Sequence, residues 1–254
     1  MRGGRVFLGK IGVDPVTLAG ALDGIAALVG TGRGGTVFTP NVDHVVRAEE
    51  DDAFREAYSR VDLSLVDGVP VLWALRAFGA AVPEKVSGSD LVLPLMERAA
   101  ERGWRVYLLG GAEGVPAGAA QRLVERYPSL RVVGTESPWI DPTEPPSARA
   151  ELVARIRAAT PDVVLVALGS PKQELFCDET RDALRPAVLV GVGASLDFIA
   201  GTAQRAPAWV SCIGLEWFYR LAHEPRRLWR RYLLRDPKFI AVLAREARAR
   251  RAAS

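Results

Sequence analysis

The 254-residue sequence is poor in the side chains that build metal centres and covalent cross-links. Its two cysteines, Cys177 and Cys212, lie far apart and form no CxxC pair, so the sequence indicates neither a disulfide framework nor a zinc site. The two histidines, His44 and His223, are too few for a His-rich metal centre. We expect His44 to be a structural residue inside a helix, and a reducing cytoplasm is the simplest setting for the chain.

Long apolar runs are also missing. Residues 1–6 are short, polar and Gly-rich, without the apolar core of a signal peptide. No stretch approaches the roughly 20 apolar residues that a membrane span requires. Because 49% of the residues are hydrophobic and 25% are charged, we expect a globular protein with a sizeable core that is soluble or peripheral to a membrane.

One common nucleotide-site motif is absent and another does not occur in its usual place after a strand. No Asp-x-Asp occurs, although metal-dependent nucleotide-sugar enzymes commonly place one after an apolar strand, so we expect no metal. The acidic run Glu49–Asp52 is predicted to be solvated surface between helices. No GxGxxG follows a strand-length run, since the cluster Gly30–Gly35 precedes one. The charge of a leaving diphosphate would have to be neutralised by Lys, Arg or helix dipoles.

Positive charge is concentrated at the end of the chain. From residue 201 onward there are twelve Lys and Arg against four Asp and Glu, a net +8, whereas residues 1–200 carry −5. Trp209, Trp217 and Trp229 fall in the same region. Arginines interleaved with aromatics suit a polyanionic partner, namely anionic lipid, a diphosphate or nucleic acid. The alternative is a solvated helix face with its aromatic side chains in the core.

Strand and helix patterns alternate along the first 200 residues. Apolar, β-branched runs of strand length occur at 36–39, 61–66, 106–109, 130–133, 163–168 and 188–192. Helices are predicted to begin at Asp14-Pro15, at Ser87–Asp90 and at Ser170-Pro171, and to cover 115–127 and 147–158. This order predicts a Rossmann-like α/β domain over residues 1–200, with a mostly parallel sheet and helices on both faces. Residues 201–254 are predicted to form a helical, basic appendage.

The carboxyl ends of the predicted strands are unusually polar, and such ends are where α/β proteins bind ligands. Asp67 follows the run 61–66, where partial desolvation could raise its pKa and suit it as a general base. The alternative for Asp67 is an N-cap. Other strand ends supply further candidates, each with a structural alternative as a cap, turn or surface residue: Thr39, Asn41, Gly110, Gly111, Ser170, Gln173 and Asp197. Glycines and helix N-termini at these ends favour a nucleotide ligand.

Several segments of the chain, taken in order, resemble a known family. The segments Thr39-Pro40-Asn41, Asp62 to Val69, Ser87 to Asp90, Leu108 to Gly111, Leu168 to Glu174 and Gly191 to Phe198 look like successive motifs of the WecG/TagA/CpsF glycosyltransferases. Arg205-Ala206-Pro207, Gly214 to Leu221 and Glu224 to Tyr232 continue the series. Ordered motifs over about residues 37–240 are far more specific than any one of them.

The resemblance implies a cytoplasmic enzyme, peripheral on the inner face of the plasma membrane. Such an enzyme transfers a sugar, N-acetylmannosamine or a related hexose or uronic acid, from a UDP-sugar to an undecaprenyl-diphosphate-linked sugar, for cell-surface polysaccharide or teichoic acid. The family inverts the anomeric centre without a metal. Asp67 matches its proposed general base, and Thr39, Asn41 and Gln173 match pocket residues. Lys85 stands where the family often has Arg, which keeps the charge and loses the bidentate fork.

Together these observations lead to a hypothesis for the reaction. Gly110, Gly111 and the helix N-terminus at Ser170 would contact the nucleotide and diphosphate, with Asp197 as a further substrate contact. Three arginines of the appendage would close over the site: Arg220, Arg227 and Arg230. Trp229 and Tyr232 would face lipid headgroups.

Two other functional classes stay open at this point. A nicotinamide- or adenine-nucleotide enzyme is compatible with the fold but disfavoured, because no GxGxxG follows a strand. A nucleic-acid-binding protein could use the basic appendage, but the negative remainder and the lack of a reading motif argue against it. A homo-oligomer is compatible with the sequence.

Overall fold

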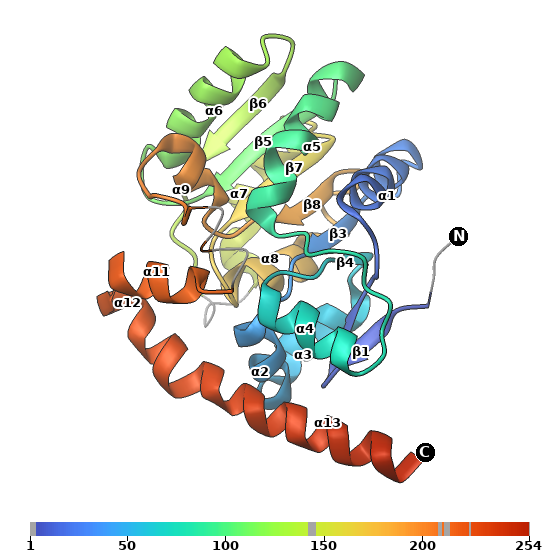
Figure 1. Cartoon of the computed structure of the whole chain (residues 1–254). Coiled ribbons are helices and arrows are strands. Elements are labelled where there is room, and N and C mark those ends of the chain that lie inside the picture. Colours follow the sequence, from blue (N-terminus) through green and yellow to red (C-terminus); the bar gives the residue numbers. More distant parts are fainter. Residues whose placement is uncertain (1–3, 142–145, 208–209, 211–213, 224, 254) are drawn as a thin grey trace.

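The protein is a parallel six-stranded sheet with helices on both faces (Figure 1). The computed structural model describes residues 4–141, 146–207, 210, 214–223 and 225–253. The sheet has the order β4-β3-β8-β7-β5-β6, and all five strand pairs are parallel. Its strands are β3 (Gly35–Phe38), β4 (Leu63–Ser64), β5 (Arg105–Gly110), β6 (Arg131–Glu136), β7 (Val163–Ala167) and β8 (Val188–Gly191). The α/β class predicted from the sequence is therefore confirmed.

Alternation of side chains along the strands builds two cores, one on each face. In β5, Val106 and Leu108 pack on one face, whereas Tyr107 and Leu109 pack on the other, as the two-residue period of a strand requires. The first face is covered by α1 (Leu18–Gly30), α5 (Gly88–Arg102), α6 (Val115–Arg126) and α9 (Ser195–Ala200). The second is covered by α2 (Val42–Glu50), α3 (Asp52–Arg60), α4 (Val69–Ala77), α7 (Ala150–Ala158), which follows η1 (Pro146–Arg149), and α8 (Lys172–Thr180).

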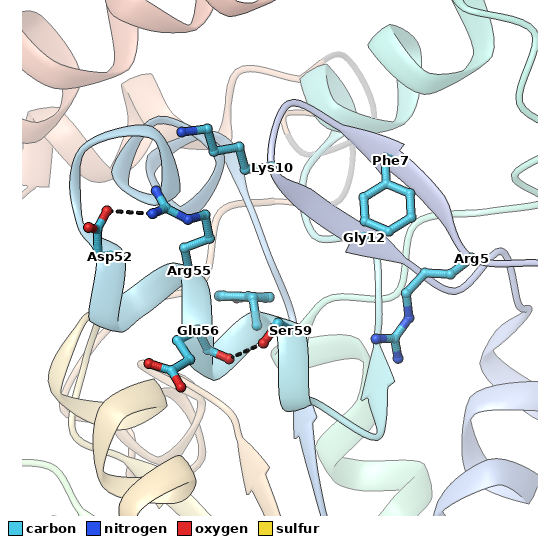
Figure 2. Close-up of a pocket in the computed structure, with 9 residues that line it drawn as sticks. Arg5, Phe7, Lys10, Gly12, Asp52, Arg55, Glu56 and Ser59 are labelled. Atoms are coloured by element: carbon cyan, nitrogen blue, oxygen red, sulfur yellow. Dashed lines mark hydrogen bonds and ion pairs between the residues drawn. The ribbon is translucent and has the colours of Figure 1, made fainter.

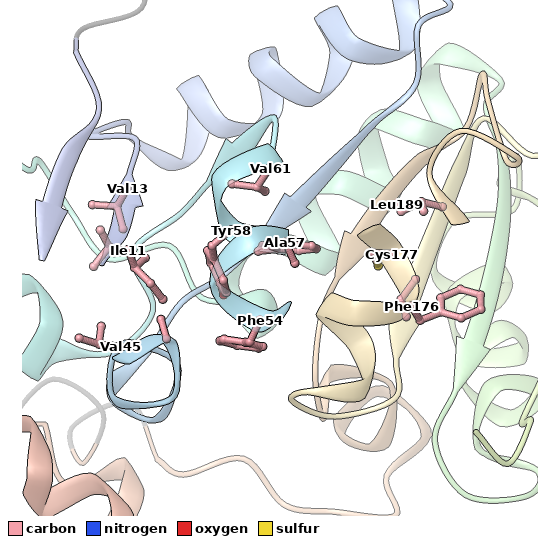
Figure 3. Close-up of a cluster of buried hydrophobic side chains, with 14 of the residues drawn as sticks. Ile11, Val13, Val45, Phe54, Ala57, Tyr58, Val61, Phe176, Cys177 and Leu189 are labelled. Atoms are coloured by element: carbon pink, nitrogen blue, oxygen red, sulfur yellow. The ribbon is translucent and has the colours of Figure 1, made fainter. Parts of the chain in front are cut away.

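The second core includes a hairpin that the sequence did not predict. Strands β1 (Val6–Leu8) and β2 (Ile11–Val13) pair antiparallel. Figure 3 shows Ile11 and Val13 of this hairpin beside Phe54 and Tyr58 of α3. Each strand has only three residues, which is too short for an alternation pattern to stand out in the sequence.

The predicted helix start at Asp14-Pro15 is wrong. Helix α1 begins at Leu18, and Thr17 caps it by accepting a hydrogen bond from Gly20 N. Asp14 has another task, because its carboxylate accepts hydrogen bonds from the Arg5 guanidinium at 2.9 and 3.1 Å and from Ser64 N at 2.8 Å. It thus joins the hairpin to β4. By contrast, α5 begins at Ser87–Asp90 as predicted, and these two residues form its capping box.

The C-terminal segment runs along the molecule as a chain of helices. It comprises α11 (Glu216–His223), α12 (Pro225–Trp229), the π-helical η2 (Arg230–Arg235), η3 (Asp236–Lys238) and α13 (Phe239–Ala253). Figure 1 shows α13, in red, passing α2. Phe239 and Val242 are buried and belong to the second core.

The acidic run 49–52 is only partly the solvated surface that the sequence predicted, because Glu50 and Asp52 are exposed whereas Glu49 and Asp51 are half-buried, and the run also meets this segment. Arg245 donates to Glu49 at 2.7 Å and Lys238 donates to Glu50 at 2.6 Å, while Asp51 caps α3. The run is thus where α13 and η3 contact α2. None of the helices within the described ranges combines the length and the apolar composition needed to cross a membrane.

Candidate active site

The carboxyl ends of the parallel strands border a cavity of about 680 Å³. Its walls come from the residues that follow β3, β4, β5, β7 and β8 and from the C-terminal helices. Nine of the residues singled out from the sequence line it: Thr39, Asn41, Asp67, Gly111, Ser170, Gln173, Asp197, Arg220 and Arg230. The fold therefore brings together residues that are widely separated in the sequence. We call this space the polar cavity.

A second cavity of about 320 Å³ adjoins the first. Both are bordered by Asn41, Asp67, Glu216, Arg220 and Arg231, so these five residues form a shared wall. The rest of the second lining is largely apolar: Val42, Val69, Pro70, Trp217, Phe239 and Ile240. We call this space the apolar cavity.

Two further predicted site residues lie elsewhere, and the side chain of a third is not described. Lys85 lines the apolar cavity instead of the polar one and forms an ion pair with Asp90. Gly110 borders neither cavity; at the end of β5 it lies against β7, where an added Cβ would come within 2.6 Å of the Ala167 carbonyl. Arg227 belongs to α12, but its side chain lies outside the described residues. Trp209 and Cys212 also lie outside them.

Asp67 is set in the shared wall by backbone geometry. Its N–H donates to Pro40 O at 2.9 Å, which ties the exit of β4 to the exit of β3. The following Gly68 has φ +91°, a conformation that L side chains rarely adopt. Gly68, and not Asp67, is the N-cap of α4, and that helix has no side-chain cap. The capping alternative for Asp67 is therefore wrong.

The pKa of Asp67 is raised from its usual value to about 7. Burial is the largest cause, because it disfavours the ionised form, and the nearby Glu216 carboxylate adds to it. The cations Lys85 and Arg231 act in the opposite direction. Asp67 thus lines both cavities and titrates near neutral pH, which are the properties that a general base requires.

Asn41 and Gln173 are held in place by specific hydrogen bonds. Asn41 is the N-cap of α2, but its side chain does not cap the helix; Oδ1 accepts from Arg231 Nη2 at 2.9 Å. Gln173 is only 3% exposed, so its alternative as a surface residue is wrong. Its Oε1 accepts from Gly193 N and its Nε2 donates to Glu174, both at 2.8 Å. Gln173 therefore joins the loops that follow β7 and β8.

Behind Gln173 lies a buried polar network. Glu174 is fully buried, and its Oε1 lies 4.0 Å from His44 Nε2. His44 Nδ1 lies 2.7 Å from the Tyr58 hydroxyl. Burial lowers the pKa of His44, although the Glu174 and Asp43 carboxylates oppose it, so the imidazole is neutral at pH 7. His44 lies in α2, as expected, and it also borders the polar cavity.

Two residues of the C-terminal segment were missed by the sequence analysis. Arg231 and Arg235 lie on the π-helical η2, and both border the polar cavity. Arg235 Nη1 donates to Asp43 Oδ1 at 3.0 Å, and Arg231 Nε lies 3.9 Å from Asp43 Oδ2. The sequence signals were the four-residue spacing of two arginines in a region with many and, for Arg231, its place in the family-like segment Glu224 to Tyr232. Nothing in the sequence connected them with Asn41 and Asp43.

Other features delimit the site. Within the described ranges, no group of three or more His, Cys, Asp or Glu side chains is arranged to hold a metal ion. A separate groove of about 570 Å³ lies between the β1–β2 hairpin and α3 (Figure 2). It is bordered by Phe7, Arg55 and Glu56, among others, and shares no residue with the polar or apolar cavity.

Comparison with known proteins assigns the chain to a family. A sequence model of the glycosyl transferase WecG/TagA/CpsF family matches residues 6–253. The chain belongs to this family. It is also 31% identical over 217 residues to an N-acetylglucosaminyldiphosphoundecaprenol N-acetyl-beta-D-mannosaminyltransferase of Bacillus spizizenii, covering 85% of this chain and 81% of the relative. As a member of the WecG/TagA/CpsF family the protein is a glycosyltransferase, and the nicotinamide-enzyme and nucleic-acid alternatives gain no support.

Proposed function

We propose that this glycosyltransferase moves N-acetylmannosamine, or a closely related sugar, from a UDP-sugar to an undecaprenyl-diphosphate-linked sugar. The name of the Bacillus spizizenii relative supports the lipid-linked acceptor and the mannosaminyl group. The observation that carries the proposal is the position of Asp67 in the wall between the polar and apolar cavities. A base at that position can reach a donor in one cavity and an acceptor in the other.

The two cavities differ in the ligand chemistry that they suit. The polar cavity has Ser170 at the start of α8, with a buried hydroxyl that has no partner within the described residues and that suits a nucleoside diphosphate. The apolar cavity has Trp217, Phe239 and Ile240, which suit the first units of a polyprenyl chain. Its charged end has Lys85, Arg220 and Arg231, which suit the diphosphate of the acceptor.

The proposed reaction is a single displacement. The acceptor hydroxyl oxygen forms a bond to the anomeric carbon while the bond from that carbon to the diphosphate oxygen breaks. The electron pair leaves with the diphosphate, and Asp67 takes the hydroxyl proton. Attack from the face opposite the diphosphate inverts the anomeric centre. We propose that Arg230, which borders only the polar cavity, stabilises the charge on the departing diphosphate, and that Arg220 and Arg231 in the shared wall act on this diphosphate as well as on that of the acceptor, so that the reaction runs without a metal.

We further propose that the C-terminal helices lie on the inner face of the plasma membrane. They expose large apolar side chains next to arginines: Trp217, Phe218, Trp229, Leu233, Leu234 and Ile240. Arg230 lies over the Trp229 ring at 5.4 Å. Apolar side chains for the acyl boundary and cations for anionic headgroups are the combination that binds a lipid surface. This placement would deliver a lipid-linked acceptor directly to the apolar cavity.

A donor panel tests the proposal. The full chain is incubated with a polyprenyl-diphosphate N-acetylglucosamine acceptor and, separately, with UDP-N-acetylmannosamine, UDP-N-acetylglucosamine and UDP-glucose, in EDTA. We expect transfer from UDP-N-acetylmannosamine above the other two and β-linked product from an α-linked donor by NMR. No transfer from any UDP-sugar, or transfer with retention, overturns the proposal.

Whether the chain forms a homo-oligomer stays a prediction.

A further inference from the structure

Trp139 is the most exposed of the large apolar side chains within the described ranges. Its side chain is 87% exposed, although it borders the polar cavity together with Pro138 and Ile140. It lies in the connection that follows β6. An indole left in water at the edge of a cavity is an unused apolar contact surface, and aromatic rings in such positions commonly stack on planar ligands.

The ring is held by the first residue of α8. Lys172 Nζ lies 4.4 Å from the centroid of the Trp139 ring and donates to Ile140 O at 2.7 Å. These contacts fasten the connection to the helix that also supplies Gln173 to the cavity. The cation covers part of the ring, and the remaining surface stays open to a ligand.

The sheet order separates Trp139 from Asp67 along the polar cavity. Asp67 follows β4, and Trp139 is attached through Lys172 to the end of β7. Strands β4 and β7 are three places apart in the sheet, which is about 14 Å at the usual strand spacing. The residues that follow β8 lie between them and border the polar cavity, where a diphosphate would pass.

We propose that Trp139, supported by Lys172, is the platform on which the nucleobase of the donor stacks. The inference rests on the proposed UDP-sugar donor and goes beyond it by assigning the base to one end of the polar cavity. The sugar then lies at the Asp67 end, and the base lies on Trp139. Stacking is available to any base through its π-face, so Trp139 contributes affinity for the nucleoside, and hydrogen bonds elsewhere select uracil.

Calorimetric titration of UDP into the full chain tests the inference. Base–aromatic stacking corresponds to roughly 10- to 100-fold in Kd. We therefore expect Trp139→Ala to raise the Kd for UDP by about that factor and Trp139→Phe to restore most of the affinity. The matched control is Trp73→Ala, because Trp73 is 56% exposed on α4 and borders neither the polar nor the apolar cavity. It should bind UDP as the wild type does.

The outcomes separate the inference from the proposed function. If the wild type binds UDP and Trp139→Ala binds it equally well, the stacking role is overturned while the UDP-sugar proposal stands. If the wild type does not bind UDP at all, both are overturned. Steady-state kinetics give a second readout: a stacking role raises the donor KM far more than it lowers kcat, whereas an equal fall in kcat would contradict it, because the ring lies far from the reacting carbon.

Discussion

Arg231 donates a hydrogen bond from Nη2 to Asn41 Oδ1 at 2.9 Å, between residues 190 positions apart in the sequence. Asn41 follows β3 in the sheet, and Arg231 lies on η2 of the C-terminal segment. This bond and the Arg235–Asp43 bond at 3.0 Å place η2 against the start of α2. The wall shared by the polar and apolar cavities therefore exists only when the C-terminal segment is docked.

Replacing Arg231 should undock this segment. We expect Arg231→Met to lose the bond to Asn41 and to cost about 1.5–3 kcal/mol of the free energy of unfolding, the usual range for a hydrogen bond to a charged group. Transfer activity should fall with it. Limited proteolysis should cut the variant within the C-terminal segment faster than the wild type. Arg248→Met is the control, since Arg248 is exposed on α13; equal protease sensitivity of both variants would contradict the docking role.

The pH dependence of transfer should follow Asp67. Its pKa is about 7, above the usual 3.8, and only the ionised form accepts a proton. Below pH 7 the fraction ionised falls about tenfold per pH unit, so kcat/KM should fall with the same slope and level off above pH 7. A pH–rate profile between pH 5 and 9 measures this. A flat profile across pH 6 to 8 would contradict the assignment.

Removing a charge next to Asp67 should shift the acidic limb of the pH–rate profile, where kcat/KM falls, in a known direction. Asp67 faces Glu216, Lys85, Asp90 and Arg231, and after burial the Glu216 carboxylate is the largest cause that raises its pKa. Glu216→Gln removes a negative charge, which makes ionised Asp67 less unfavourable, so the acidic limb should shift to lower pH. Glu125→Gln, on the exposed face of α6, should leave the limb unchanged.

Gln173 allows a matched comparison between a buried and an exposed amide. Gln173→Glu places a carboxylate oxygen where Nε2 now donates to Glu174 at 2.8 Å, inside the protein. We expect a loss of about 3 kcal/mol in stability and a higher donor KM, because two buried carboxylates then face each other. Gln121 makes the same bond to Glu125 at 2.9 Å on the surface. Gln121→Glu should cost only about 0.5 kcal/mol, and similar melting temperatures for both variants would count against the prediction.

Substitution of Gly110 and of Gly114 by alanine separates the cost of steric crowding from the cost of backbone strain. Both have positive φ, +103° and +80°. A Cβ at Gly110 would lie 2.6 Å from the Ala167 backbone, whereas one at Gly114 meets no heavy atom within 4 Å. Gly114→Ala should therefore lower the free energy of unfolding by about 1 kcal/mol through backbone strain alone. Gly110→Ala should lower it several times more, because β5 and β7 must move apart. Chemical denaturation of the two variants measures the difference, and equal costs would show that the strands tolerate the methyl group.

The sheet was predictable because the apolar runs that contain its strands are long enough to show a pattern. The runs that became β5 and β7 are apolar and β-branched, and the polar residues that follow such runs include Asp67, Gln173 and Ser170. Parallel strands bring such ends to one edge, so the cluster followed from topology alone. The confirmed helix start at Ser87–Asp90 is likewise local in sequence.

The missed features depend on contacts between distant parts of the chain. Arg231 and Arg235 look like any other residues of an Arg-rich helix until Asn41 and Asp43 are placed beside them. Asp14 resembles a helix cap because its partners, Arg5 and Ser64, are found only after the hairpin has folded onto β4. Such pairings are set by tertiary packing, which local sequence patterns do not encode.

The most direct test of the central claim is single-turnover transfer from UDP-N-acetylmannosamine to the lipid-linked acceptor by wild type and Asp67→Asn. The account predicts that Asp67→Asn lowers the rate of transfer by about 10²- to 10⁴-fold, the usual contribution of a general base, while the Kd for UDP changes little. Transfer by Asp67→Asn at the wild-type rate would contradict it.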